Sequence, residues 1–179
     1  MQEEPCLAEF APVRGSLYVD YMMLMGYGII LVRVDGYYYL LDESGERIIE
    51  MRFDDVYNIS EGFIPVMKNG RWGFVNRMGE IVIDFAFFEV DIFEYGIAVV
   101  AVANTDISRP LRCDFPDEYT FFDYFDNFLE MAFYYGYISM GLIDVYGEWV
   151  IPPVWEDIRN FRKGLASVSM GGLWGVINF

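Results

Sequence analysis

Apolar residues along the chain occur in short runs that are separated by two kinds of turn. The tighter turns, at Asp35-Gly36, Asn69-Gly70 and Gly171-Gly172, each lie between two such runs. Pairs of this kind supply the positive φ angles that a two-residue hairpin turn requires. The runs are rich in Val, Ile, Phe, Tyr and Trp, which suit a pleated, half-buried surface. The pattern therefore predicts β-hairpins.

A wider turn of the form Asp/Asn-x-x-Gly also recurs, at Asp42–Gly45, Asn76–Gly79 and Asp144–Gly147. In such a turn the first side chain caps the backbone and the glycine takes the left-handed conformation. Each unit is therefore predicted to be a meander. In the cleanest copy we expect three strands and a connector, at Phe63–Lys68, Arg71–Asn76, Glu80–Asp84 and Phe85–Tyr95.

These features recur every 34 residues without insertions. An aromatic column with an acid two positions later contains Phe53/Asp55, Phe87/Glu89, Phe121/Asp123 and Trp155/Asp157. Self-similarity at a fixed period is typical of tandem repeats. We expect a single domain, 1–179, with units at about 1–35, 36–69, 70–103, 104–137 and 138–171 and a partial unit at 172–179. The unit 104–137 keeps the period but has Cys113 and Glu130 where other copies have glycine, which indicates a degenerate repeat.

Other columns predict the packing of the array. Ala98, Ala132 and Ala166 recur with valines two positions after each aligned position, at Val66, Val100 and Val168, as on the inner face of a strand. The fold expected is an all-β tandem array of about five antiparallel hairpin repeats. An open, twisted array is preferred because stacks are common for units of this size. A closed ring or barrel-like toroid is the alternative, since Ala11–Arg14 occupies the position that follows the last strand.

The stretch Gly70-Arg71-Trp72-Gly73-Phe74-Val75-Asn76 and the later pair Trp174-Gly175 resemble the WG-repeat family of bacterial β-repeat proteins. The resemblance covers about residues 17–179, although Tyr38-Tyr39, Asp106-Ile107 and Met140-Gly141 replace the Trp-Gly pair in other copies. It implies an all-β interaction scaffold without catalytic residues. The expected structural repeat positions are Gly62, Gly70, Trp72, Gly73, Gly79, Gly96, Ala98, Ala132, Gly147, Gly164, Ala166, Trp174 and Gly175.

Composition narrows the class of protein. Hydrophobic residues make up 55% of the chain, which excludes disorder, yet no apolar run approaches the roughly twenty residues of a membrane helix. The acidic start lacks the features of a secretion signal, so we expect a cytoplasmic protein. Two cysteines, Cys6 and Cys113, are too few for a disulfide framework, and the chain has no histidine for zinc. No cofactor and no metal are expected.

Charge is unevenly distributed. The net charge is −16, and no lysine or arginine occurs from Cys113 to Ile158. Such a field disfavours nucleic acid and attracts a basic protein, although solubility alone also accounts for it. The aromatic-rich stretch 116–131 has helical spacing at Phe121, Phe125 and Phe128, which predicts a short helix. Its side chains are either core or a partner-binding face, for which the candidates are Asp114, Asp117, Glu118, Tyr119, Asp123, Asp126 and Glu130.

Two further columns have a structural and a functional interpretation. Tyr38, Trp72 and Trp174 are expected to be core residues rather than a platform for sugars. The acids Asp55, Glu89, Asp123 and Asp157 are expected to cap turns rather than bind calcium, because calcium loops place several ligands within a dozen residues. Nothing in the spacing selects two carboxylates as an acid-base pair, so no enzyme is expected.

Three functional hypotheses follow. The first is a non-enzymatic protein–protein interaction module that holds another protein. The second is an acidic inhibitor or immunity-type protein that masks a basic nuclease or DNA-binding partner, and the third is a β-array that binds glycans or small ligands through exposed aromatic rings. Neither nucleic acid nor a membrane is an expected partner.

Overall fold

The computed structural model describes residues 19–103 and 138–179, and every regular element in these two stretches is a β-strand. The strands are β1 Tyr21–Gly26, β2 Ile29–Val34, β3 Tyr37–Leu41, β4 Asp55–Val56, β5 Phe63–Lys68, β6 Arg71–Asn76, β7 Ile81–Phe87, β8 Glu89–Val90, β9 Ile97–Ala103, β10 Ile138–Asp144, β11 Trp149–Trp155, β12 Asp157–Arg162, β13 Leu165–Met170 and β14 Leu173–Asn178. The helix predicted at 116–131 lies outside the described residues.

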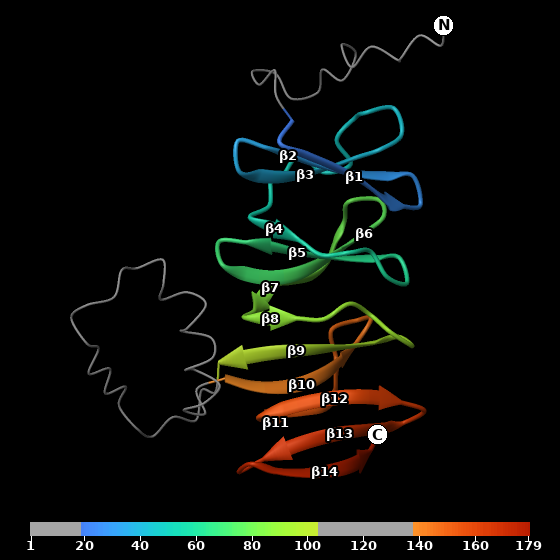
Figure 1. Ribbon diagram of the computed structural model, residues 1–179. Coiled ribbons are helices and arrows are strands. Elements are labelled where there is room, and N and C mark those ends of the chain that lie inside the picture. Colours follow the sequence, from blue (N-terminus) through green and yellow to red (C-terminus); the bar gives the residue numbers. More distant parts are fainter. Residues whose placement is uncertain (1–18, 104–137) are drawn as a thin grey trace, which may run out of the picture. The chain divides into compact units, whose positions relative to one another are not determined.

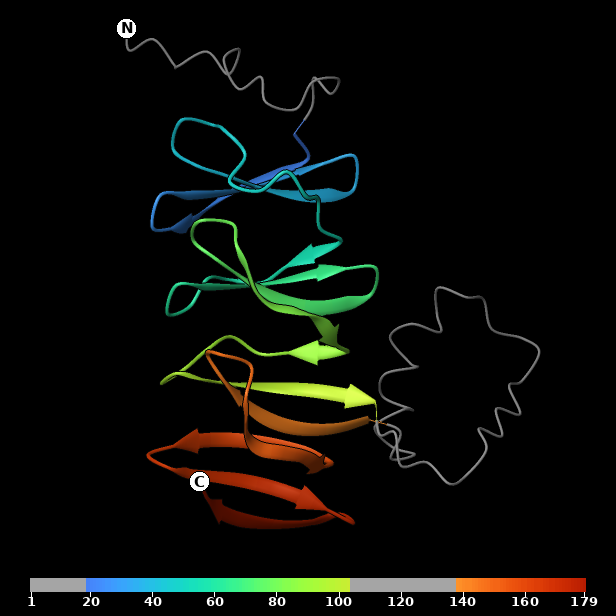
Figure 2. The same ribbon diagram turned by 180° about the vertical axis from the view of Figure 1, so that it is seen from behind.

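The strands form four antiparallel sheets in two compact units (Figure 1). The first unit, Met1–Ala86, contains the sheets β1-β2-β3 and β4-β5-β6-β7. The second unit, Phe87–Phe179, contains β8-β9-β10-β11 and β12-β13-β14. Figure 2 shows from behind that neighbouring strands of each sheet follow one another in the chain. The predicted all-β fold of tandem hairpin repeats is confirmed, and none of the described sheets closes into a barrel.

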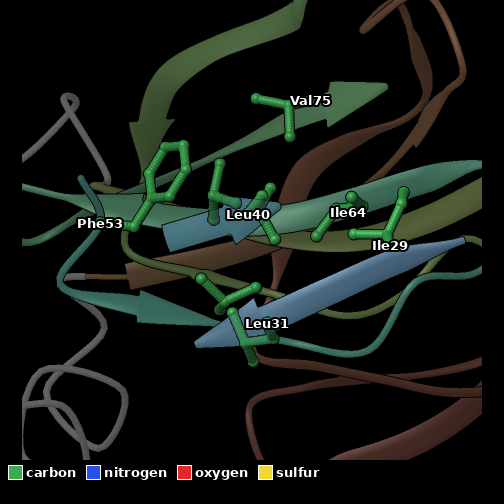
Figure 3. Close-up of a cluster of buried hydrophobic side chains, with 8 residues drawn as sticks. Ile29, Leu31, Leu40, Phe53, Ile64 and Val75 are labelled. Carbon is green, nitrogen blue, oxygen red and sulfur yellow. The ribbon is translucent and has the colours of Figure 1, made fainter. Parts of the chain in front are cut away.

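The core of the first unit lies between its two sheets. Ile29, Leu31 and Leu40 from the first sheet, together with Phe53, pack against Ile64 of the second (Figure 3). Leu40, Phe53 and Ile64 are fully buried. Burying a Leu, Ile or Phe side chain contributes about 1.5–3 kcal/mol. These buried side chains therefore stabilise the unit by holding its two sheets together.

The second unit repeats this arrangement with its own residues. Val99 and Leu142 from β9 and β10 pack in one cluster with Ile158 of β12 and Ala166 and Val168 of β13. Ala166 is only 1% exposed. Its small side chain keeps the two sheets close, as the recurring alanine column predicts.

The strands predicted for the cleanest copy match the structure at two of three positions. β5 and β6 span the predicted Phe63–Lys68 and Arg71–Asn76. The third strand runs to Phe87 instead of Asp84, and the predicted connector contains the short strand β8. Phe87 is 6% exposed. The strand continues to this residue because Phe87 is buried and ends the alternation of β7.

The tight turns have the predicted conformation. Asp35/Gly36, Asn69/Gly70 and Gly171/Gly172 all have positive φ at both positions. A further set of such turns was not predicted, at Tyr27/Gly28, Glu61/Gly62, Tyr95/Gly96 and Lys163/Gly164. Their first residue is Tyr, Glu or Lys, and these types do not favour positive φ as Asn and Asp do. Only the recurring second glycine could have identified them.

The segment 104–137 lies outside the described residues, but the strands that flank it are described. The strands on either side of it, β9 and β10, pair directly over their whole length, from Ile97↔Asp144 to Ala103↔Ile138. In the sheet β4-β5-β6-β7 the equivalent strands β5 and β6 are joined by the two-residue turn Asn69-Gly70. The 34 extra residues therefore replace a hairpin turn. The segment has the length of one repeat, so the sequence period continues across it. The degenerate repeat unit predicted at 104–137 lies outside the described residues.

Candidate interaction surface

The candidate partner-binding residues, from Asp114 to Glu130, lie outside the described residues, and so does Ala132. What the structure fixes is where their segment is attached. It leaves the sheet after Ala103 and returns at Ile138, and these two residues are partners at the end of the β9–β10 ladder. Connections longer than about 12–15 residues in compact domains are commonly functional. The acidic, aromatic segment thus connects β9 to β10 at one end of their ladder.

Five arginine side chains in the described residues lie over aromatic rings of the chain itself. The guanidinium carbon of Arg52 lies 3.9 Å from the Tyr37 ring centroid, and that of Arg47 lies 4.6 Å from Tyr39. Arg33, Arg77 and Arg159 contact Tyr38, Tyr27 and Trp174 in the same way. These cation–π contacts hold the positive charges close to the protein surface.

The sequence contained a signal for one of these contacts. Arg33 and Tyr38 are direct partners across the β2–β3 ladder, and they flank the Asp35-Gly36 turn. The register of a two-residue hairpin places such residues on the same face. The contacts of Arg47 and Arg52 depend instead on how the chain returns after the wide turn, which the sequence pattern did not specify.

Carboxylates extend into solvent at many positions of the described chain, among them Glu43, Glu50, Asp84, Glu94, Glu148 and Glu156. Two of the described basic residues, Arg47 and Arg159, also pair with acids, Glu50 and Asp157. Because the chain has 28 acids and 12 lysines and arginines, acidic groups dominate the charge. Exposed carboxylates thus contribute to the net charge of −16 at the protein surface.

The wide turns are capped as predicted. The Asp42 Oδ1 atom accepts hydrogen bonds from the backbone N–H groups of Ser44 and Glu46, at 2.9 and 3.0 Å. Asn76 and Asp144 accept the same two bonds in their own turns, at identical distances. The hydrogen bond from the Ser44 hydroxyl, followed by the bond from the Glu46 N–H, lowers the pKa of the Asp42 carboxyl below its usual value.

The acids two positions after the aromatic column, which we expected to cap turns, lie elsewhere. Asp55, Glu89 and Asp157 stand at the first residue of β4, β8 and β12, not in turns. Asp55 accepts a hydrogen bond from the N–H of Val56, and Asp157 pairs with Arg159. The described residues contain no group of three or more acids or cysteines placed to hold a metal ion.

The structural repeat positions fall into two sets. The glycines at turns, namely Gly62, Gly70, Gly79, Gly96, Gly147 and Gly164, have positive φ. The inner-face residues Ala98 and Ala166 are buried, and Val66, Val100 and Val168 are buried beside them. Gly73 belongs to neither set, because a Cβ there would lie 2.7 Å from the Ile83 carbonyl oxygen. It is small because a strand passes directly over it.

The aromatic column divides between the two units. Trp72 is 4% exposed and its ring lies 4.2 Å from that of Tyr57, so it belongs to the core as predicted. Trp174 is 54% exposed, which the prediction of a core position did not anticipate. The reason is that β14 is the end strand of its sheet, whereas β6 has a strand on both sides. Trp72 therefore offers no ring to a sugar, whereas Trp174 is exposed but has the Arg159 guanidinium over its ring.

No helix in the described stretches is long and apolar enough to span a membrane. The family model described as "WG containing repeat" matches the chain at residues 40–72, 72–104 and 140–174. The matches stop where the segment 104–137 begins and resume after it, so the sequence family and the strand pairing agree on what is regular. Comparisons with curated proteins and with solved structures gave no match.

Proposed function

The chain belongs to the WG-containing repeat family, and from that premise we propose that it is a non-enzymatic protein–protein interaction module. In this proposal the paired sheets serve as a rigid support for the acidic segment 104–137. A partner of opposite charge docks on that segment. Binding residues are commonly placed on loops that a rigid scaffold positions.

The observation that carries the proposal is the direct pairing of Ala103 with Ile138. An inserted segment that begins and ends at adjacent backbone positions leaves the core of the array unchanged. The scaffold sheets therefore tolerate a segment whose sequence departs from the repeat. From Cys113 to Tyr137 the segment has six acids and no basic residue, and such a charge distribution favours binding to a basic surface.

A second candidate function is a narrower form of the first. An acidic inhibitor or immunity-type protein would cover the basic active site of a nuclease or the basic face of a DNA-binding protein. It is favoured by the net charge of −16, because such a negative field attracts a strongly basic surface of this kind.

The proposal is tested by capture of a partner with the whole chain followed by salt titration. A variant with Asp117, Glu118, Asp123 and Asp126 replaced by lysine reverses charge on the segment only. We expect at least a tenfold loss of affinity at low salt, since opposed like charges at an interface cost several kcal/mol. Wild-type affinity should fall steeply between about 0.05 and 0.3 M salt.

The matched control replaces four exposed acids of the sheets, Glu43, Asp84, Glu94 and Glu148, by lysine. It changes the net charge by the same amount and leaves the segment intact. If both variants lose affinity equally, binding depends on overall charge and the segment is not the site. If the captured partner is a nuclease whose activity the chain leaves intact, the inhibitor hypothesis is wrong while the interaction module stands.

A further inference from the structure

The last sheet ends in a strand that carries apolar side chains and, within residues 19–103 and 138–179, has a neighbour on one side only. β14 pairs with β13 only, as Figures 1 and 2 both show. Leu173, Trp174 and Val176 of β14 are 77%, 54% and 68% exposed. Their counterparts on β6 include Trp72 and Phe74, which are 4% and 0% exposed. An exposed, apolar edge of this kind is a template for strand addition.

Gly175 of β14 lacks the neighbouring strand that lies against the corresponding glycines of β6 and β10. A Cβ on Gly73 or Gly141 would lie 2.7 Å from a backbone oxygen of the following strand, at Ile83 or Ile151. Around Gly175, the aligned residue of β14, no atom lies within 4 Å. The Trp-Gly strand is thus shaped to receive a strand against its glycine, and on β14 that place is open.

The chain itself contains a segment in the right phase. The chain returns along β3 through isolated bridges that begin at Arg47, and along β6 and β10 as β7 and β11, which begin at Ile81 and Trp149. One repeat earlier this phase falls on residues 13–19, Val-Arg-Gly-Ser-Leu-Tyr-Val. Val19 takes the position of Phe53 and Phe87, which are 0% and 6% exposed, yet Val19 is 52% exposed. An apolar residue that is buried in two copies is therefore uncovered in the first.

We propose that residues 12–19 of a second copy of this chain add to β14 as an antiparallel strand, so that the chains associate head to tail. The register follows from two other copies. Tyr38 pairs with Phe53 and Met140 with Trp155, which places Trp174 opposite Val19. Leu41 pairs with Arg47 and Ile143 with Trp149, and both place Ile177 opposite Val13.

The proposed register requires the backbone bonds that are seen at β3. On β3, Tyr38 and Phe53 exchange two hydrogen bonds, and Leu40 and Asp42 each bond once to the returning chain. The last of these runs from the Asp42 N–H to the Glu46 carbonyl, at 2.8 Å. Residue 12 takes the place of Glu46, so Pro12 acts there as an acceptor, the one backbone role open to proline.

The donor segment belongs to another chain because of its order in the sequence. In the described copies the covering strand joins the sheet that precedes it in the chain: Phe53 follows β3, and β11 follows β10. Residues 12–19 precede every sheet of their own chain. A donor and an acceptor on different surfaces of one protein produce heterologous, head-to-tail association. This interface does not depend on the acidic segment and goes beyond the proposed function.

The register is tested by cross-linking. Val13→Cys and Ile177→Cys are made as separate single variants of the full chain, each with Cys6→Ser and Cys113→Ser. Leu41 and Arg47 are the pair that corresponds to Ile177 and Val13, and they form a non-hydrogen-bonded pair of the antiparallel ladder. The Cα atoms of such a pair are about 4.5 Å apart, which is within the range of a disulfide. Mixing the two variants under mild oxidation should give a disulfide-linked heterodimer on a non-reducing gel.

Arg14→Cys mixed with Ile177→Cys is the matched control, because a shift by one residue turns the thiol to the other face. Equal cross-linking of the control overturns the register. If the double variant Val13→Cys/Ile177→Cys cross-links only within monomers, the segment closes on its own chain and the second-copy proposal is wrong. Absence of any cross-link, with circular dichroism unchanged, overturns strand addition itself.

A second measurement uses the open glycine. Gly175→Ala places a methyl group where the incoming backbone would lie, so sedimentation velocity should show association weakened by about tenfold or more. Undiminished association of this variant contradicts the proposed docking of the strand.

Discussion

Asp42, Asn76 and Asp144 show how one side chain closes the same turn in three copies. Each oxygen accepts two backbone N–H groups, and the glycine three positions later takes the positive φ that lets the chain reverse. Aspartate and asparagine alternate in this role because the acceptor oxygen is what the turn uses. The charge of the side chain is secondary.

Asn76→Ala tests this role. The variant removes the acceptor for Met78 and Glu80 and should lower the free energy of unfolding by about 1 kcal/mol, the usual net value of lost hydrogen bonds. Urea denaturation measures the change. Asn76→Asp reproduces the residue found in the two other copies and should stay close to wild type. A loss equal to that of the alanine variant would show that the amide, and not the shared oxygen, holds the turn.

Three arginine side chains of the first unit each contact one tyrosine ring. Arg33, Arg47 and Arg52 lie over three consecutive tyrosines, Tyr37 to Tyr39. Consecutive strand residues point to opposite faces, so the three rings distribute the cations over both sides of β3. The positive charge of the first unit is thereby held against the sheet.

At the scale of elements, the Trp-Gly strand is defined by what lies against its glycine. Gly73 and Gly141 receive the backbone of the next strand in their own units, whereas Gly175 faces open space. The three glycines occupy the same place in the sequence period. Their environments differ because β14 alone among these strands ends its sheet.

Gly73→Ala and Gly175→Ala form a matched pair. Neither glycine is among those with positive φ, so the backbone accepts alanine at both. At Gly73 the methyl group meets backbone atoms of Ile83 and Asp84, and the variant should lose about 1–3 kcal/mol of stability. At Gly175, below the concentration at which chains associate, stability should be unchanged or slightly higher. Thermal unfolding of both variants measures the two changes in stability. Equal losses of stability would show that the geometry of the strand itself, and not the neighbouring strand, selects glycine.

At the scale of the whole molecule, the net charge of −16 acts against the folded state. Many carboxylates face solvent, and several arginines are occupied by rings of the chain. Self-repulsion of this kind destabilises compact structure and is screened by salt. The acidity that suits a basic partner is therefore a cost to the protein alone.

Raising sodium chloride from about 0.02 to about 0.3 M should increase Tm by about 2–4 °C, the shift that roughly 1 kcal/mol gives in a chain of this length. The variant with Glu43, Asp84, Glu94 and Glu148 changed to lysine should show a smaller rise. Differential scanning calorimetry measures both. A fall of Tm with salt in the wild type would mean that attractive pairs dominate the charges of the fold.

The sequence by itself determined the repeat, the hairpin turns and the strands β5 and β6, because turn glycines and alternating apolar residues act over a few neighbouring positions. It also identified the family that the match at 40–104 and 140–174 shows. The four tight turns that begin with Tyr, Glu or Lys escaped prediction, since the surrounding ladder imposes their positive φ.

Tertiary structure alone decided three things. It showed that 104–137 is inserted between paired strands, that Trp72 is buried where Trp174 is exposed, and that Gly175 faces open space. The 34-residue sequence period does not reveal these differences, because a segment of one repeat length leaves every column of the repeat aligned. Burial depends on which strand lies alongside, and that is a property of the assembled sheets.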